Sequence, residues 1–143
     1  MKRRAWVLRG LVAGALLACH SCSNPASKTD EEMGYLYVVN RSDYIITLES
    51  VAIDGTPVVA TWILRGGQYA ALSVEPEEPS NIRLYPSGTV ISFNYAWTVN
   101  NQSFSPTTGT TLNGTKTIKL REDTLVPGFV VFEIEDGDTR NQP

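Results

Sequence analysis

The pattern of apolar and polar residues divides the chain into an apolar N-terminal run, a short polar stretch and a long region of strand-like segments. From residue 35 onward, β-branched and aromatic runs are separated by turn residues at the spacing typical of an all-β domain. No run after the N-terminal segment repeats its apolar residues at helical intervals. The sequence therefore predicts a strand domain over residues 35–136 and a frayed polar tail over residues 137–143.

Alternation within two segments predicts which strand faces are buried. Between residues 89 and 100, every second residue from Ile91 to Val99 is apolar, and the intervening residues are small or polar. Successive side chains of a strand point to opposite faces, so this period of two indicates one buried face. By the same reasoning, Val130, Phe132 and Ile134 are expected to share a face in the last strand.

The segment 44–53 changes phase along its length. Ile46 and Leu48 have one parity, whereas Val51 and Ile53 have the other. One extra residue in the strand would return all four side chains to a common face, so we expect a β-bulge near Glu49 and Ser50.

Glycine-rich turns suggest how the strands connect. Gly66 and Gly67 lie between the runs 58–64 and 68–75, and two adjacent glycines suit the positive φ angles of a tight hairpin. We therefore expect one antiparallel β-sandwich of seven to eight strands, either immunoglobulin-like or transthyretin-like.

The first 18 residues have the layout of a secretory signal peptide. Three basic residues at positions 2–4 precede an apolar run from Gly10 to Ala18. The run is too short for a stable membrane-spanning helix, which needs about 20 apolar residues.

The end of this run, Leu16-Leu17-Ala18-Cys19, resembles the lipobox of bacterial lipoproteins. The resemblance implies that Leu16 and Ala18 are recognition residues for the lipoprotein signal peptidase and that Cys19 becomes the acylated N-terminus. Leu17 departs from the pattern, where a small residue is more usual. Residues 1–18 would then be the signal peptide and residues 19–34 a flexible tether.

The residues after Cys19 leave alternatives open. In some bacterial lipoproteins, an aspartate directly after the lipidated cysteine retains the protein in the inner membrane. His20 stands at that position here, so the resemblance implies the outer membrane of a cell envelope. Cys22 is a second candidate for lipidation, and an ordinary cleaved secretory signal is a second interpretation of the segment. A redox or zinc C-x-x-C site lacks the further ligands that zinc needs.

Charge and composition limit the class of partner. Removal of residues 1–18 takes away four basic residues and no acidic ones, so 12 basic and 15 acidic residues become 8 and 15, a net charge of −7. Nucleic-acid binding depends on basic contacts to phosphates, so we expect no nucleic-acid partner. Contact with the membrane is expected through the N-terminal lipid alone.

The region after Cys22 contains neither cysteine nor histidine, which removes the usual nucleophile and base pairs. Carboxylates remain, among them those in the loop at Glu75, Glu77 and Glu78 and at the end of the last strand. Glu135, Asp136 and Asp138 surround a glycine as calcium ligands can, but without the spacing of a calcium loop. We expect no catalytic residues, no metal site, no cofactor and no enzyme activity.

Tyr35 and Tyr37 share one parity of the first strand and would form an exposed aromatic pair if that face points outward. Exposed aromatic patches mark protein or sugar contacts, so this pair is our candidate partner surface. The sequence thus favours a noncatalytic binding or assembly module for an envelope protein or glycan. A structural subunit of a surface fibre or secretion assembly and a carboxylate-based hydrolase are the alternatives.

Overall fold

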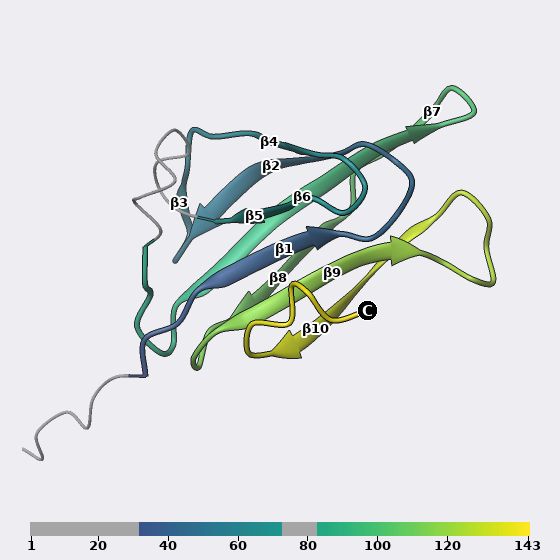
Figure 1. The fold of residues 1–143 in the computed structure, drawn as a ribbon. Coiled ribbons are helices and arrows are strands. Elements are labelled where there is room, and N and C mark those ends of the chain that lie inside the picture. Colours follow the sequence, from purple (N-terminus) through teal and green to yellow (C-terminus); the bar gives the residue numbers. More distant parts are fainter. Residues whose placement is uncertain (1–31, 73–82) are drawn as a thin grey trace, which may run out of the picture.

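The structure is a computed structural model that describes residues 32–72 and 83–143. All regular secondary structure in these two ranges is β-strand, in agreement with the predicted all-β domain (Figure 1). The described part has ten strands rather than seven or eight, and four of them are only two or three residues long. The strands are β1 (Leu36–Asn40), β2 (Ile46–Ile53), β3 (Thr56–Pro57), β4 (Trp62–Leu64), β5 (Tyr69–Ala71), β6 (Val90–Val99), β7 (Gln102–Phe104), β8 (Thr107–Thr111), β9 (Lys116–Glu122) and β10 (Val130–Asp136).

The strands form two sheets. One sheet has the order β10-β9-β1-β5, and the other has the order β3-β2-β6-β7, with β4 beside β2 and β8 beside β6. Strands β1 and β9 run parallel, from Leu36 beside Lys116 to Asn40 beside Leu120. The other pairings are antiparallel, as expected of a mostly antiparallel fold, but this parallel pair makes the first sheet mixed.

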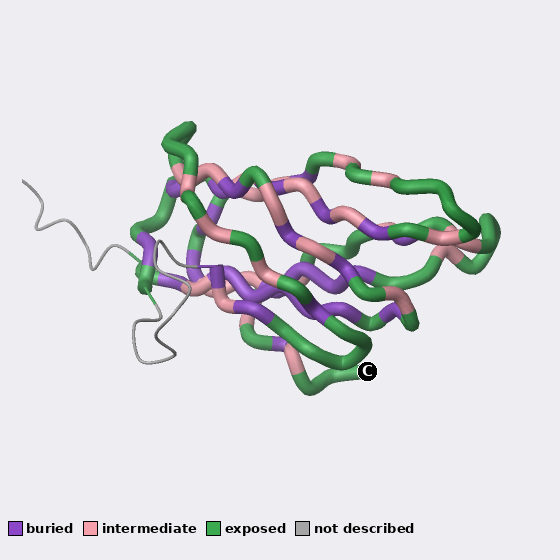
Figure 2. The backbone as a smooth tube through the Cα atoms, turned by 90° about the horizontal axis from the view of Figure 1, so that it is seen from above, coloured by how far each residue is buried: buried purple, intermediate pink, exposed green. Residues whose placement is uncertain are grey.

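The two sheets enclose one apolar core (Figure 2). On β6, Ile91, Phe93, Tyr95 and Trp97 are at most 4% exposed, and the residues between them are half-buried or exposed. The alternation predicted for this strand is confirmed. Only one face of this sheet packs against the opposite sheet, so only every second side chain of β6 is buried.

The predicted bulge in β2 is also confirmed. The register between β2 and β6 shifts between Glu49 and Ala52, and Ser50 has a φ of 53°. Because of this extra residue, Val51 is buried with Ile46 and Leu48, each at most 1% exposed. The bulge therefore keeps the apolar residues of a phase-shifted sequence in one core.

The glycine pair forms a turn but not a hairpin. Gly67 has a φ of 80°, and the amide of Gln68 donates to the carbonyl oxygen of Arg65 at 3.0 Å. However, β4 pairs with β2 and β5 pairs with β1, so the turn crosses from one sheet to the other. The predicted hairpin is therefore wrong. The same glycine turn can join two strands of one sheet or two strands of different sheets, so the local sequence does not distinguish them.

The last strand is only partly buried. Val130 is 3% exposed, but Phe132 and Ile134 are 43% and 38% exposed. Strand β10 is the edge of its sheet, so the opposite sheet covers its inward side chains only in part. The three side chains share a face, as predicted, with Phe132 opposite Leu120 and Ile134 opposite Ile118, but only Val130 is fully buried.

Residues 137–143 pack against the first sheet rather than fraying (Figure 1). The Thr139 amide donates to the hydroxyl oxygen of Thr117 at 3.0 Å, and Nη2 of Arg41 donates to the carbonyl oxygens of Arg140 and Gln142. The predicted frayed tail is therefore wrong. These hydrogen bonds offset the conformational entropy that this short polar segment loses when it becomes ordered.

Candidate functional site

The residues of the predicted membrane anchor lie outside the described part of the chain. Leu16, Ala18 and Cys19 belong to residues 1–31, and Glu75, Glu77 and Glu78 belong to residues 73–82. The lipid anchor at Cys19 therefore stays a prediction. Within the described ranges there is no helix long and apolar enough to cross a membrane.

The tyrosines predicted as a partner surface contact each other but are not freely exposed. The ring centroids of Tyr35 and Tyr37 are 5.7 Å apart. Tyr37 is only 6% exposed, and Tyr35 is half-buried. The expected exposure is wrong for Tyr37, because Arg140 of the C-terminal segment covers its ring, and the role of the two tyrosines as a partner surface stays a prediction.

Arg140 occupies the surface of these aromatic rings. Its guanidinium carbon lies 4.0 Å from the ring centroid of Tyr37 and 4.5 Å from that of Tyr69. Asp138 holds the guanidinium through two hydrogen bonds of 2.7 Å. These bonds raise the pKa of Arg140 and lower the pKa of Asp138, whereas burial raises the pKa of the Tyr37 hydroxyl. Cation–π contact and ion pairing thus fix the tail over β1.

The carboxylates at the end of the chain are paired with basic side chains. A row of ion pairs joins β9 to β10, and the pair of Asp138 with Arg140 extends it. Among the described residues, no group of three or more acidic, cysteine or histidine side chains is arranged to hold a metal ion. The pairs on the two strands are Lys116–Asp136 at 2.6 Å, Lys119–Glu135 at 3.0 Å and Arg121–Glu133 at 3.1 Å.

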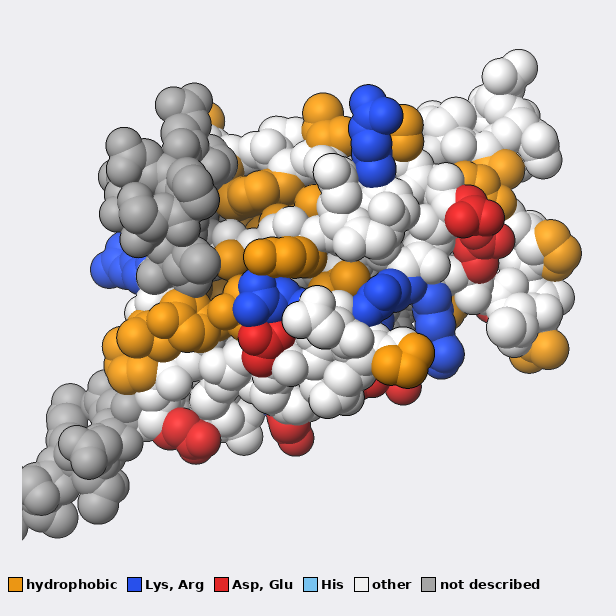
Figure 3. All heavy atoms as spheres, viewed as in Figure 1, with side chains coloured by type: hydrophobic (Ala, Val, Ile, Leu, Met, Phe, Trp, Pro, Cys, Tyr) orange, Lys and Arg blue, Asp and Glu red, His pale blue; other side chains and the backbone are white. Residues whose placement is uncertain are grey.

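One free side of the molecule is the edge of β10 and the loop before it. In the described part of the chain, the outer edge of β10 pairs with no other strand. Separate apolar side chains reach the surface at the right-hand end of the molecule, where this loop lies (Figure 3). Five exposed apolar residues of the loop and of β10, here called the β10 patch, have exposed fractions of 38% to 87%: Leu125, Val126, Phe129, Phe132 and Ile134.

A chain of aromatic contacts holds this patch to the core. Phe132 meets Tyr95 edge to face at 6.3 Å, and Phe129 contacts Phe104 at 4.9 Å. Trp97 stacks between the two groups, 5.6 Å from Tyr95 and 5.1 Å from Phe104. The indole NH of Trp97 donates to the Gly128 carbonyl oxygen at 3.0 Å. The exposed rings are therefore held by neighbours rather than free to rotate.

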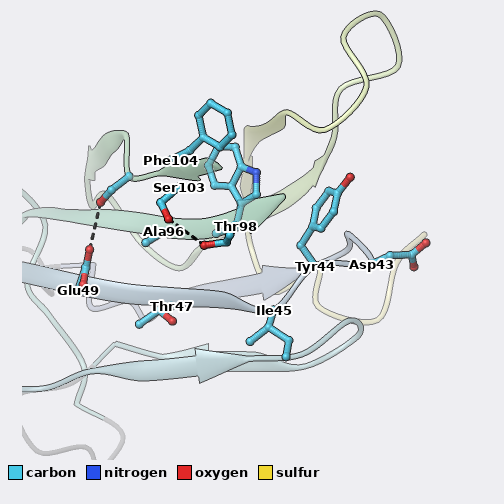
Figure 4. A pocket seen from close by; sticks show the side chains of 11 residues that line it. Asp43, Tyr44, Ile45, Thr47, Glu49, Ala96, Thr98, Ser103 and Phe104 are labelled. Carbon is cyan, nitrogen blue, oxygen red and sulfur yellow. Dashed lines mark hydrogen bonds between the residues drawn. The ribbon is translucent and has the colours of Figure 1, made fainter. Parts of the chain in front are cut away.

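A separate groove of about 600 Å³ lies along β2, β6 and β7 (Figure 4). Its lining residues include Asp43, Glu49 and Phe104. Phe104 also contacts Phe129 of the β10 patch, so the two surfaces adjoin at this residue. Comparison with protein-family models and with curated proteins finds no match to this chain.

Sequence reasoning missed the β10 patch, although a signal was present. Leu125 and Val126 are adjacent apolar residues in a segment that Pro127 and Gly128 mark as a loop. Apolar residues in a loop next to a strand are hard to bury, because loops run over the surface. That combination indicates an exposed apolar surface before any fold is known.

Proposed function

We propose that this protein is a lipid-anchored, noncatalytic binding module of a bacterial cell envelope, and that it uses the β10 patch and the free edge of β10 to bind a partner protein. Its two-sheet domain would be a β-sandwich of the immunoglobulin-like or transthyretin-like type. Cys19 would carry the lipid in the outer membrane, and the residues after it would tether the domain.

The free edge of β10 is the observation that carries this proposal. An edge strand presents unpaired backbone NH and CO groups, to which an extended partner segment can add as a further strand. Soluble monomers rarely leave contiguous apolar residues exposed without a use. Five exposed apolar residues within ten positions, beside an open strand edge, therefore favour a protein-binding surface.

The noncatalytic part of the proposal is supported by chemistry. The sequence after Cys22 has neither cysteine nor histidine. Glu133 and Glu135 pair with basic residues of β9, and hydrogen bonds from Thr139 and Lys119 lower the pKa of Glu135, so neither carboxylate is well placed for hydrolytic acid–base work.

The anchor is tested by replacing each cysteine. In a bacterial host, we expect Cys19→Ala to abolish the diacylglyceryl mass increase and to release the protein from membranes, because the lipid is its only proposed attachment. Cys22→Ala is the matched control and should leave both properties unchanged. Intact mass and membrane fractionation measure them, and a membrane-bound Cys19→Ala protein would exclude the assignment.

The partner surface is tested by crosslinking from the full chain in its envelope. A photoreactive residue at Ile134 should give a discrete crosslinked product. The same residue at Ile63, an exposed isoleucine of β4 in the other sheet, serves as the control. Ile134→Lys should weaken recovery of the partner by about tenfold or more, the factor that corresponds to about 1.4 kcal/mol. Equal products from both positions would count against a specific site at β10.

The same experiment separates a second candidate, a structural subunit that pairs β10 with another copy. In that case the crosslinked product has the mass of two chains, and sedimentation of the full chain in detergent shows oligomers that Ile134→Lys disrupts. A product of other mass identifies a different protein as the partner.

A further inference from the structure

The free edge of β10 presents the backbone groups of alternate residues. At the two ends of the strand, the Phe129 carbonyl oxygen and the Gly137 amide bond to backbone groups beside β9, at 2.8 Å and 2.7 Å. Hydrogen-bonded pairs alternate along an antiparallel ladder, so the odd-numbered residues between these two bonds also face β9. The NH and CO groups of Phe132 and Ile134 therefore point to the free edge, where an added strand would bond to them.

The side chains of β10 alternate between two kinds of surface. Phe132 and Ile134 lie opposite core residues of β9, on the inner face of the sheet. Glu133 and Glu135 have the other parity and lie on the outer face. A strand that adds beside β10 therefore meets apolar side chains on one face and carboxylates on the other.

The two carboxylates lie nearer to the free edge than the cations that pair with them. The side chains of Glu133 and Glu135 are 45% and 29% exposed, whereas Lys119, the partner of Glu135, is 7% exposed. Strand β9 lies about 4.8 Å further from the edge than β10. Each carboxylate has about four acceptor positions, so it can bind a second cation while it stays paired with the first.

Strand β9 shows which side-chain pattern fits beside β10. Its residues Lys119 and Arg121 pair with the two carboxylates, and Ile118 and Leu120 are 0% exposed in the core. Basic and apolar residues thus alternate along β9 in register with β10. A strand of the same pattern at the free edge would place each carboxylate between two cations and would cover the exposed apolar residues of β10.

The same carboxylates oppose pairing with a second copy of the chain. In an antiparallel pairing of two β10 strands centred on Glu133, the two Glu133 side chains face each other. When the pairing is centred on Ile134, Glu133 and Glu135 face each other across the copies. Like charges directly opposite destabilise a pair of strands. A strand with basic residues at these positions avoids this repulsion.

We infer that the strand bound at β10 is an extended segment of another protein, in which basic residues alternate with apolar ones. This inference rests on the proposed function and adds the chemistry of its partner. The C-terminal segment turns back from β10 over the sheet towards β1, where Arg140 lies on Tyr37 (Figure 1). It therefore leaves the outer edge of β10 open to the added strand.

The test titrates the full chain in detergent with three fluorescent peptides. The basic peptide has the sequence of β9, KTIKLRE, which pairs with β10 from its other side. The acidic peptide has glutamate in place of each lysine and arginine, and the scrambled peptide has the basic composition without alternation. Fluorescence anisotropy measures binding. We expect the basic peptide to bind about tenfold or more tightly than either of the others. Added salt should weaken its binding.

Substitutions locate the binding at β10. Glu133→Gln combined with Glu135→Gln should weaken binding of the basic peptide by about fivefold or more, because both carboxylates lose their charge. Glu49→Gln, at a half-buried carboxylate of β2 in the other sheet, is the matched control and should leave binding unchanged. A photoreactive residue at Ile134 should crosslink the basic peptide, and the same residue at Ile63 should not. Circular dichroism checks the fold of each variant.

Three results would overturn the inference. They are no binding of the basic peptide, equal binding of the acidic or scrambled peptide, and equal affinity in the double glutamine variant and in Glu49→Gln. The envelope crosslinking described above tests the binding surface separately. Equal products from Ile134 and Ile63 there would remove the surface itself. A discrete product from Ile134 that is a second copy, or a segment without basic residues, would keep the surface and overturn only the inferred chemistry of the partner.

Discussion

Asn40 links three segments through one buried side chain. Its Nδ2 donates to the carbonyl oxygens of Tyr44 at 2.7 Å and Leu64 at 2.9 Å. Its Oδ1 accepts hydrogen bonds from the amide of Ser42 at 2.9 Å and from the Ser42 hydroxyl at 2.7 Å. The residue is 0% exposed, so no water can replace these bonds. One amide thus joins the end of β1 to the following loop and to the end of β4.

We predict that Asn40→Ala lowers the free energy of unfolding by about 2–4 kcal/mol. The substitution leaves buried carbonyl and amide groups without partners, and each such group costs about 1–3 kcal/mol. Urea unfolding of the full chain measures the change. Asn113→Ala, at an exposed asparagine, is the control and should stay within about 0.5 kcal/mol of the unsubstituted chain. Equal stability of the two variants would contradict the proposed role of Asn40.

At the scale of the element, β2 depends on its bulge. Ser50 has a positive φ of 53°, a conformation that glycine adopts without the steric cost that other residues meet. The side chain of Ser50 is exposed, so backbone conformation rather than packing decides what the position accepts. The bulge also decides which side chains of β2 reach the core, because it changes the parity between Leu48 and Val51.

Two substitutions at this position should act in opposite directions. We predict that Ser50→Gly keeps or raises the free energy of unfolding by up to about 1 kcal/mol, since glycine relieves the strain at positive φ. Ser50→Val should lower it by about 1–2 kcal/mol, because a β-branched residue tolerates this conformation poorly. Thermal and urea unfolding measure both effects. A valine variant as stable as the glycine variant would show that the bulge does not set the conformation.

At the scale of the whole molecule, the C-terminal segment completes the cover of the first sheet. All five residues of β1 are buried, although the opposite sheet can cover only one face of a strand. Tyr37 lies under Arg140, and the hydroxyl of Thr117 on the neighbouring strand donates to the Gly137 carbonyl oxygen at 2.8 Å. The last residues of the chain therefore act as a second layer over part of this sheet.

We predict that Arg140→Ala lowers the free energy of unfolding by about 1–3 kcal/mol. The change removes a cation from two aromatic rings and from Asp138, and a desolvated cation–π contact contributes up to about 2 kcal/mol. It should also expose Tyr37 to water, which second-derivative absorbance of the tyrosines detects. Arg65→Ala, at an exposed arginine of the turn between β4 and β5, is the control. Unchanged stability and tyrosine exposure in Arg140→Ala would show that the tail contributes little to the fold.

The sequence by itself determined the features that depend on local order along the chain. Alternation in β6, the phase change in β2 and the turn at Gly67 follow from the two-residue period of a strand and from backbone conformation. The continuous apolar run of β1 is also typical of a strand covered on both faces, a signal that the predicted exposure of Tyr35 and Tyr37 overlooked.

Only the tertiary structure decided which segments become neighbours. The crossing from β4 to β5 between sheets, the parallel pairing of β1 with β9 and the packing of Arg140 over Tyr37 join residues whose local sequence is the same in either arrangement. Exposure of Phe132 and Ile134 follows from the edge position of β10, which alternation cannot reveal. The groove likewise exists only once β2 lies beside β6 and β7, because its lining residues come from segments about 50 positions apart in the chain.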